Sequence, residues 1–510
     1  MPSVVLRLAA IALLGAVLAT PALADNGTLR VAEIWELKGL DPATDDGTLE
    51  KEKSMLVETL VKALPDFSLA PDLAASWERT GDKTWLFHLR PKVTFHDGSP
   101  LTAAAVRASL ERAISLNPTV KTYTKIAAMD AKDDLTLQIT TTEAYPALPA
   151  SLAYASTAIV ATTSPKGANG TVERPVGTGP FKLDVYQPAA QTFRVVRNDS
   201  YWGDKPSIAA IEFRSVPDPT TRSLELQKGA IDFTAEVPYG DLDALINKGF
   251  TVSRNVTARD YVLSFGKLKD TPFADVRVRK AISTAINRDE IGRFVLFGMG
   301  RAAIGPFEQK MAFASKKLVA PQFDLAMAKK LLVEAGYTPD AGGTMRKEGK
   351  PLGFTLYTYP QRPGLVPIAQ AIQGQLRKAG IAVEVKISTY DAINASLKPD
   401  EARLAALATT LFPDPDFFLR AMYQSSGALN LWGYRNDKVD AALQVALTTT
   451  SDADRQAAYD QVQQLAMEDE PAILIAYYGV NVVMKPGVTN YTFNPSAHDY
   501  MLDPKMRLGQ

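Results

Sequence analysis

Two patterns of apolar residues alternate along this chain. Residues at every second position, as in Ile381–Ile387, predict a half-buried strand. Apolar residues three or four apart, as at 367–379, predict an amphipathic helix, and Gly380 follows that helix as an expected C-terminal stop. Because strands and helices follow one another in both halves of the chain, the pattern predicts an α/β protein with two lobes and a cleft between them.

The central stretch Asp260–Gly298 predicts a passage from one lobe to the other. It contains an apolar strand at Tyr261–Phe265, then a polar turn and a helix. Asp275 is the expected N-cap of that helix, because its carboxylate can accept from the free amides of the first turn. A strand that leads abruptly into an amphipathic helix in mid-chain is typical of a crossing between lobes.

Two other stretches predict elements near the lobe boundary. The loop at Asp41-Pro42 is followed by an expected helix through about Leu60, with Leu49 and Leu56 on its inner face. Near the other end, Ala472–Tyr478 and Val480–Met484 read as a final pair of strands that runs back towards the first lobe.

The length and the net charge of the chain limit the number of lobes and the kinds of partner to be expected. A chain of 510 residues exceeds the roughly 250–300 residues at which a single core stops growing, so at least two lobes are expected. Lys and Arg together number 56, and so do Asp and Glu, so no net charge favours a nucleic acid or an anionic membrane. We therefore expect no nucleic-acid partner.

The first 24 residues have the pattern of a secretory signal peptide. Arg7 precedes the apolar run Leu8–Ala19, which is too short to span a bilayer comfortably, and Ala22-Leu23-Ala24 forms an A-x-A cleavage site. The alternative is an uncleaved N-terminal anchor. Cysteine is absent from the sequence, which excludes disulfides, thiol catalysis and a lipidated cysteine after the signal. These features predict a soluble periplasmic protein that is not lipidated.

Motifs for cofactor or metal chemistry are weak. The three histidines, at positions 88, 96 and 498, do not have metal-binding spacing. Ser264–Lys267 is an S-x-x-K tetrad without the partner motifs of penicillin-binding proteins, and Pro180 removes an amide from the Gly-rich turn at Gly177–Gly179. We therefore expect no cofactor and no metal ion bound by protein groups alone.

Two loops carry candidate chemistry. Asp414 and Asp416 lie in Phe412–Phe418, where they either form the acid pair of a secreted hydrolase of peptides or glycans, or cap backbone amides in a stiff turn. Trp432 and Tyr434 flank Gly433, which suits an aromatic platform that lines a cleft, although packing under a loop is equally consistent with the pattern.

Five stretches, taken in order, resemble the family 5 extracellular solute-binding proteins of peptide and nickel ABC importers. They are Ala70–Trp77 followed by Trp85–Arg90 and Val93–Ser99, then Pro175–Leu183, Arg197–Lys205, Pro272–Ile286 and Asn430–Asp440. The resemblance implies the large type II periplasmic binding protein fold, a two-lobed α/β fold with an extra subdomain in the first lobe. It also implies a protein that closes on its ligand and delivers it to a cognate ABC permease in the inner membrane.

The resemblance implies a division of the chain. Residues 1–24 would be the signal peptide, residues 25–59, 175–270 and 476–510 would form lobe I, and residues 60–174 its peripheral subdomain. Residues 271–475 would form lobe II.

The resemblance is less specific about the chemical class of the ligand. Dipeptide binders of the family hold the substrate amine with an Asp, and Leu411 stands at the similar position here. Nickel-chelate binders hold carboxylates with arginines of the peripheral subdomain, where this chain offers Lys121 and Tyr123. Arg362 lies in the loop Thr358–Gln370, which resembles the nickel-type branch of the family. It either pairs with a ligand carboxylate through two parallel hydrogen bonds or is a solvated loop residue.

The leading hypothesis is a non-enzymatic, monomeric periplasmic binding protein for a peptide or a metal chelate. Its expected ligand-binding residues are Lys121, Tyr123, Arg362, Asp414 and Trp432. The hydrolase based on Asp414 and Asp416 is the alternative, and a sensor or chaperone-like protein on the same fold is a third possibility.

Overall fold

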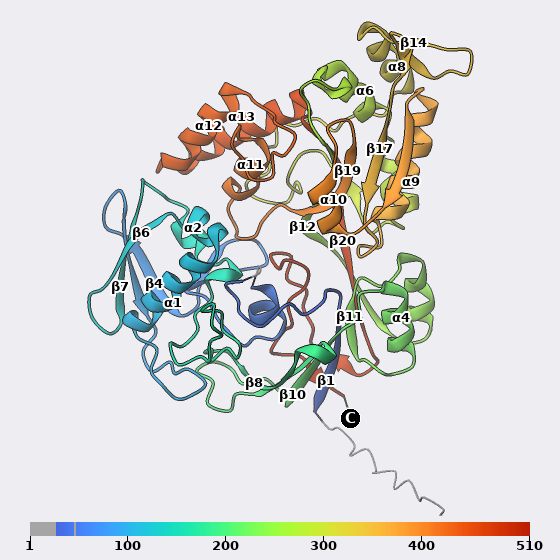
Figure 1. Ribbon diagram of the computed structural model, residues 1–510. Helices are drawn as coiled ribbons and strands as arrows, with labels where there is room; N and C mark the ends of the chain where they lie inside the picture. Colours follow the sequence, from blue (N-terminus) through green and yellow to red (C-terminus); the bar gives the residue numbers. More distant parts are fainter. Residues whose placement is uncertain (1–26, 45–46, 510) are drawn as a thin grey trace, which may run out of the picture.

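The computed structural model describes residues 27–44 and 47–509. It has two lobes, one above the other in Figure 1, joined by long strands that run between them. The predicted signal peptide lies outside the described residues. Within the residues that the structure describes, helices that combine the length and the apolar character needed to cross a membrane are absent.

One sheet of 11 strands passes through both lobes, in the order β18-β17-β19-β12-β20-β11-β1-β10-β9-β8, with β13 beside β20. Lobe I contributes β1 (Thr28–Glu33), β8 (Phe181–Gln187), β9 (Thr192–Arg197), β10 (Ala210–Ser215) and β11 (Phe233–Ala235). Lobe II contributes β13 (Arg301–Ala302), β17 (Gly353–Thr358), β18 (Ala382–Ile387) and β19 (Ala402–Ala408).

The connection between the lobes consists of β12 (Thr251–Phe265) and β20 (Ala472–Met484), which pair antiparallel along most of their length. The end of β20 at Met484 pairs with β11 of lobe I, whereas β12 pairs with β19 of lobe II from Arg259 onwards. The register shifts between Val256 and Asp260, in the middle of the connection. A bulge bends a strand locally, so this is where the chain changes direction between lobes.

The peripheral subdomain has its own sheet, in the order β4-β5-β7-β6, and its own apolar core. Its elements are β4 (Ala74–Arg79), β5 (Thr84–Leu89), β6 (Ile126–Ala131), β7 (Thr136–Thr141), α1 (Ala103–Leu116), α2 (Pro118–Thr124) and α3 (Leu148–Ser151). The hairpin β2 (Val61–Ala63) and β3 (Leu69–Pro71) leads into it. The strand β5 buries Trp85, Phe87 and Leu89 on one face.

Helices cover the sheet of lobe II, and four of them begin at a capping side chain, one of which is the predicted cap Asp275. Asp275, Asp324, Asn436 and Ser451 each accept a hydrogen bond from an amide in the first turn of the helix that follows. These helices are α6 (Val276–Thr284), α8 (Leu325–Glu334), α12 (Asp437–Thr448) and α13 (Asp452–Asp469). The lobe also contains α7 (Arg288–Glu290), α9 (Leu365–Lys378), α10 (Tyr390–Ser396) and α11 (Asp416–Tyr423), while lobe I holds α4 (Pro219–Gln227) and α5 (Leu242–Asn247).

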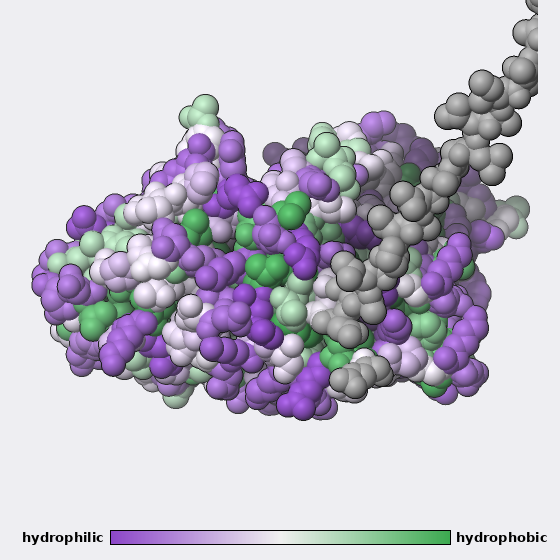
Figure 2. All heavy atoms as spheres, turned by 90° about the horizontal axis from the view of Figure 1, so that it is seen from below, coloured by the Kyte–Doolittle hydropathy of each residue, from purple (hydrophilic) through white to green (hydrophobic). Residues whose placement is uncertain are grey.

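The remaining strands are short: β14 (Thr338–Pro339), β15 (Met345–Lys347) and β16 (Lys350–Pro351) form one small sheet, and β21 (Val488–Thr489) pairs with β22 (Arg507–Leu508). Seen from below, polar residues cover most of the surface and apolar residues appear in small separate groups (Figure 2).

Two predicted elements differ from the structure. The helix expected up to Leu60 is a single π-helical turn, Leu49–Lys53, because Met55 has a φ of 53°, a left-handed conformation that stops a helix. The expected pair of strands at the C-terminal end is one continuous strand, β20. Gly479 does not turn the chain there; it lets the backbone carbonyl of Met299 approach, since a Cβ at this position would lie 1.7 Å from that oxygen.

Candidate functional site

Arg362 of lobe II reaches across to lobe I and forms two ion pairs there. Its Nη1 lies 3.0 Å from Oε1 of Glu236, and its Nη2 lies 2.8 Å from Oδ1 of Asp499. Arg362 precedes α9, Glu236 follows β11, and Asp499 belongs to the C-terminal segment, so three distant parts of the chain meet here. Only 3% of the Arg362 side chain is exposed. The contact therefore fastens the two lobes together in a closed arrangement.

Further charged side chains surround this contact. Arg259 of β12 donates to Asp499 over 3.0 Å, and Lys53 lies 3.7 Å from the same carboxylate and 2.9 Å from Glu33. We call the group the interlobe cluster: three acidic and three basic residues, namely Glu33, Glu236, Asp499, Lys53, Arg259 and Arg362.

Aromatic rings enclose the cluster. The Arg362 guanidinium lies 5.1 Å from the ring centroid of Trp35 and 5.5 Å from that of Tyr478, both within cation–π range. The Tyr478 hydroxyl donates to Glu236 over 2.6 Å, and that of Tyr500 donates to Glu33. The rings exclude water, which strengthens the electrostatic interactions between the charges they surround.

The acids of the cluster have different proton affinities. Burial alone would raise the pKa of Asp499, but the charges of Arg362, Arg259 and Lys53 outweigh it and hold that pKa well below the usual range. Burial raises the pKa of Glu236, and Arg362 opposes this rise only in part. Asp499 is therefore the fixed negative charge to which Arg362 and Arg259 bind.

Such a cluster can recognise a ligand that carries both signs of charge. Its six charges balance one another only while the lobes are closed, because Arg362 comes from lobe II and the three acids come from lobe I. In an open form, Arg362 can donate hydrogen bonds to a carboxylate of the ligand. The lobe I acids can accept hydrogen bonds from an ammonium group of the ligand. The arrangement suits binding; it offers no nucleophile with an adjacent base.

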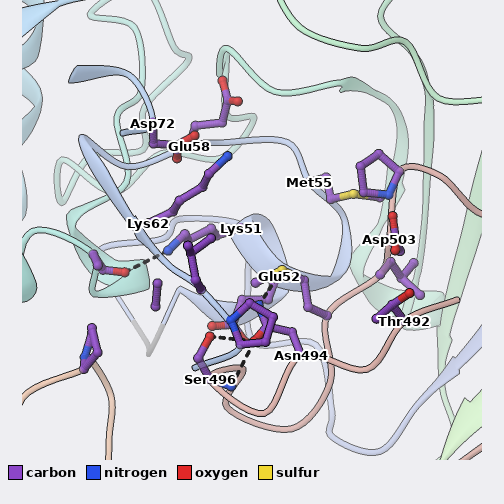
Figure 3. Close-up of a pocket in the computed structure, with 18 of the residues that line it drawn as sticks. Lys51, Glu52, Met55, Glu58, Lys62, Asp72, Thr492, Asn494, Ser496 and Asp503 are labelled. Atoms are coloured by element: carbon purple, nitrogen blue, oxygen red, sulfur yellow. Dashed lines mark hydrogen bonds between the residues drawn. The ribbon is translucent and has the colours of Figure 1, made fainter. Parts of the chain in front are cut away.

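A cavity of about 420 Å³ lies on the other side of the turn Leu49–Lys53 (Figure 3). The cavity is lined by residues of both lobes: Lys51, Glu52, Met55, Val57 and residues of the β2–β3 hairpin and of the segment 492–505 from lobe I, and Thr410–Pro413 from lobe II. In Figure 3, Lys62 lies close to Glu58 and Asp72 at one end of the cavity. Because both lobes line it, the cavity belongs to the same cleft as the interlobe cluster.

Two of the five predicted ligand-binding residues, Arg362 and Tyr123, make contacts between the lobes. Arg362 is part of the interlobe cluster. Tyr123 packs against Phe412 and Phe417 of lobe II, with ring centroids 5.7 and 5.0 Å apart, so it joins the peripheral subdomain to lobe II. Lys121 is exposed on α2, two residues before Tyr123 and therefore on a different face of that helix.

The other two lie inside lobe II. Asp414 accepts from Nη2 of Arg455 over 2.9 Å and caps the amide of Asp416, whose own carboxylate pairs with Arg420 over 2.7 Å. Trp432 is 0% exposed and packs in the core. In this closed form Asp414 holds a loop and Trp432 fills a core, so neither faces the cavity.

Sequence reasoning did not find Glu236, Asp499 or Arg259. Each stands outside any motif, and the three come together only because β11, β12 and the C-terminal segment meet at the hinge. One signal was available: Arg259 comes shortly before the predicted strand Tyr261–Phe265 in the stretch that crosses between the lobes, and a charged residue beside such a strand is a candidate for a ligand contact.

Among residues 27–44 and 47–509, no group of three or more His, Cys, Asp or Glu side chains is arranged to hold a metal ion.

The model of the family "Bacterial extracellular solute-binding proteins, family 5 Middle" matches residues 68–430. This chain belongs to that family. Its members are binding proteins rather than enzymes, so the hydrolase alternative is set aside, and this solute-binding protein is the substrate-binding component of an ABC importer of the nickel and peptide type. The two-lobed fold predicted from the sequence is confirmed by solved structures of relatives.

Three relatives show the range of this family. The nickel-binding periplasmic protein of Escherichia coli is 30% identical over 87% of this chain and 88% of its own length. The structure of NikA from Staphylococcus aureus in complex with Ni(L-His)2 superposes with a TM-score of 0.82 at 26% identity, covering 95% of this solute-binding protein and 100% of that chain. The oligopeptide-binding protein AppA of Bacillus subtilis, solved with a nonapeptide, gives 0.78 at 25% identity and covers 94% of this protein and 99% of AppA.

Proposed function

We propose that this protein captures a small zwitterionic solute between its lobes, with the ligand carboxylate on Arg362, and presents the closed complex to a permease of the inner membrane. The observation that carries the proposal is the double ion pair from Arg362 to Glu236 and Asp499, which spans the cleft. A guanidinium binds a carboxylate through two parallel hydrogen bonds, so a ligand carboxylate fits where Asp499 now lies.

Closure follows from the origins of the charged groups. In an open form, Arg259, Lys53 and the acids stay with lobe I and the hinge, while Arg362 moves away with lobe II. A ligand that satisfies both sets of charges contacts both lobes only when they close. This difference in affinity between open and closed forms shifts the population to the closed form.

The ligand class follows from the same groups. Carboxylate and ammonium groups suit a short peptide or the complex of a nickel ion with an amino acid, and relatives bind both kinds: Ni(L-His)2 in the S. aureus structure and a nonapeptide in AppA. The interlobe cluster supplies charges rather than imidazoles, so we expect the protein to recognise the organic ligand around a metal ion and not the ion itself.

The site of action is the periplasm. A signal peptide cleaved after Ala24 would release the protein there, and the absence of cysteine leaves no residue for lipidation. We propose a monomer, since two lobes within one chain complete the cleft.

Native mass spectrometry of the purified mature protein, followed by release and identification of what it retains, tests the proposal. Calorimetry with the released solute then compares the wild type with Arg362→Lys, which keeps the charge but loses the planar fork. We expect at least tenfold weaker binding. The control is Arg346→Lys, a surface residue of lobe II paired with Asp340. Equal affinity in wild type and Arg362→Lys would contradict the role of Arg362.

A further inference from the structure

Glu236 has a backbone conformation that is rare for a residue with a side chain. Its φ is 60°, in the left-handed region that favours glycine, and the residue is completely buried. Such a conformation costs free energy and persists only where surrounding contacts hold it. Glu236 is also the lobe I residue that binds Nη1 of Arg362 across the cleft. The backbone is therefore strained at the point where this carboxylate meets the other lobe.

Asn481 of β20 holds the chain at this point. Its backbone carbonyl accepts from the amide of Glu236 over 2.9 Å. Its side-chain oxygen accepts from the amide of Val237 over 3.0 Å, and its side-chain amide donates to the carbonyl of Val237 over 2.9 Å. The regular pairing of β11 with β20 ends at Ala235, so these hydrogen bonds continue the connection between the two strands. Since β20 joins the lobes, the position of Glu236 is tied to the hinge.

Arg222 of α4 holds the same segment through other groups. It is completely buried, and its guanidinium donates to the carbonyl of Ala235 over 3.1 Å, to that of Glu236 over 2.6 Å and to two further backbone carbonyls. Burial raises the pKa of Glu236, and the charges of Arg362 and Arg222 both oppose this rise. Because Arg222 belongs to lobe I and Asn481 to the hinge strand, both contacts remain when Arg362 moves away with lobe II.

We infer that Asn481 and Arg222 are positioning residues: they hold Glu236 in its left-handed conformation, so that lobe I presents a fixed carboxylate to the other lobe or to the ammonium group of a ligand. This inference rests on the proposed function, because it takes Glu236 to be one of the lobe I acids that meet the ligand. It adds that closure depends on two side chains that bind backbone groups rather than Arg362. An acid fixed in advance loses less conformational entropy when the lobes close, which favours the closed form.

Single-molecule fluorescence energy transfer in the ligand-free mature protein tests this inference. Because the sequence contains no cysteine, Leu135→Cys on the peripheral subdomain and Val445→Cys on lobe II, both exposed positions, can carry the two dyes. The ratio of open to closed molecules is compared between Asn481→Ala, Glu236→Ala and the variant with both changes.

Each single variant should raise the ratio of open to closed molecules about tenfold, since a hydrogen bond to a charged group changes an equilibrium by about this factor. In the Glu236→Ala background, Asn481→Ala should add less than about threefold, because no carboxylate remains to be positioned. A merely structural role of Asn481 would not depend on the carboxylate of Glu236 in this way.

Asn430 of lobe II provides the matched control. Its side chain accepts from the amide of Tyr434 over 2.9 Å and donates to the carbonyl of Tyr434 over 2.8 Å, the same pair of hydrogen bonds that Asn481 makes with Val237. Asn430→Ala should therefore lower the free energy of unfolding about as much as Asn481→Ala, but change the ratio of open to closed molecules less than about twofold. An equal rise of the ratio in both variants would reflect a general loss of stability and would contradict the inference.

Arg222→Lys gives a second measurement and keeps the charge. A lysine lacks the planar fork that reaches both carbonyls, so we expect the ratio of open to closed molecules to rise about fivefold. Arg279→Lys is the control for this change. The buried Arg279 also donates to the carbonyl of a left-handed residue, Glu470 with a φ of 42°, but the Glu470 side chain accepts from Ser283 within lobe II. Arg279→Lys should keep the wild-type ratio.

The outcomes separate the two proposals. If Asn481→Ala and Arg222→Lys keep the wild-type ratio while Glu236→Ala raises it, the positioning inference is wrong and the proposed function stands. If Asn481→Ala raises the ratio equally with and without the Glu236 carboxylate, or if Glu236→Ala itself keeps the wild-type ratio, the inference is also wrong. The proposed function fails separately, when Arg362→Lys binds the retained solute as tightly as the wild type does.

Discussion

Arg362 and Asp499 lie 2.8 Å apart, although one belongs to lobe II and the other to the C-terminal segment of lobe I. Both side chains are almost completely buried. Since the pair spans the cleft, it stabilises the closed form even without a ligand. A solute that enters must therefore compete with a contact already present in the protein.

Replacing Arg362 should open the ligand-free protein. Arg362→Ala leaves Glu236 and Asp499 buried and without the cation they share, which costs about 3–5 kcal/mol in comparable buried pairs. The cost falls on the closed form, because only closure brings the three residues together. Small-angle X-ray scattering should show a larger radius of gyration than in the wild type.

The control for this experiment is Arg346→Ala, which removes a surface ion pair within lobe II. It should leave the radius of gyration unchanged. A triple variant, Arg362→Met with Glu236→Gln and Asp499→Asn, removes the charges together and should be more closed than Arg362→Ala. If the radius of gyration of Arg362→Ala equals that of the wild type, the ion pairs of Arg362 do not hold the lobes closed.

Asp414 should prove structural rather than catalytic. Its carboxylate pairs with Arg455 over 2.9 Å and caps the amide of Asp416, so Asp414→Ala leaves a buried guanidinium unpaired. We expect a loss of about 3 kcal/mol in the free energy of unfolding by urea. Asp437→Ala, at an exposed position in the first turn of α12, should cost less than about 1 kcal/mol. Similar values for both variants would contradict the structural role of Asp414.

The sequence predicts local structure better than the site. Asp275 and Asn436 were predictable as caps because an N-cap depends on residues within one helical turn. The interlobe cluster was not, because Glu236 and Asp499 are far apart in sequence and neither belongs to a motif. Arg362 alone was found, since its loop resembles those of solute-binding proteins; its partners depend on how β11, β12 and the C-terminal segment meet.

Glu470 should make lobe II less stable as the pH rises. Burial raises its pKa to about 7, from 4.5, and a hydrogen bond from Ser283 and the charge of Arg288 oppose the rise only in part. The folded protein therefore holds a proton that the unfolded chain releases above about pH 4.5. This contribution is fully present below pH 4.5 and is lost as the pH rises through 7, by up to about 3 kcal/mol.

Urea unfolding at pH 5 and pH 8 measures this effect. Glu470→Gln, which is neutral at both pH values, should narrow the difference in unfolding free energy between them. Glu334→Gln on α8, where the side chain is 47% exposed, serves as the control and should keep the wild-type difference. If both variants lose stability with pH as the wild type does, Glu470 is not the titrating group.

Gly479 should be essential to the hinge although it touches no ligand. It lies within β20, and a Cβ added there would meet the carbonyl oxygen of Met299 at 1.7 Å and its carbonyl carbon at 2.4 Å. Both are backbone atoms, so Gly479→Ala must displace either the strand or the segment before β13. We expect a loss of more than 2 kcal/mol in the free energy of unfolding by urea.

Gly374→Ala is the matched control, because Gly374 lies within α9 with open space around a Cβ. This variant should gain about 0.5–1 kcal/mol in the free energy of unfolding, since alanine is the better helix former. If Gly479→Ala is as stable as the wild type, β20 tolerates a side chain at this position. The close approach of the Met299 carbonyl would then not be the reason for a glycine there.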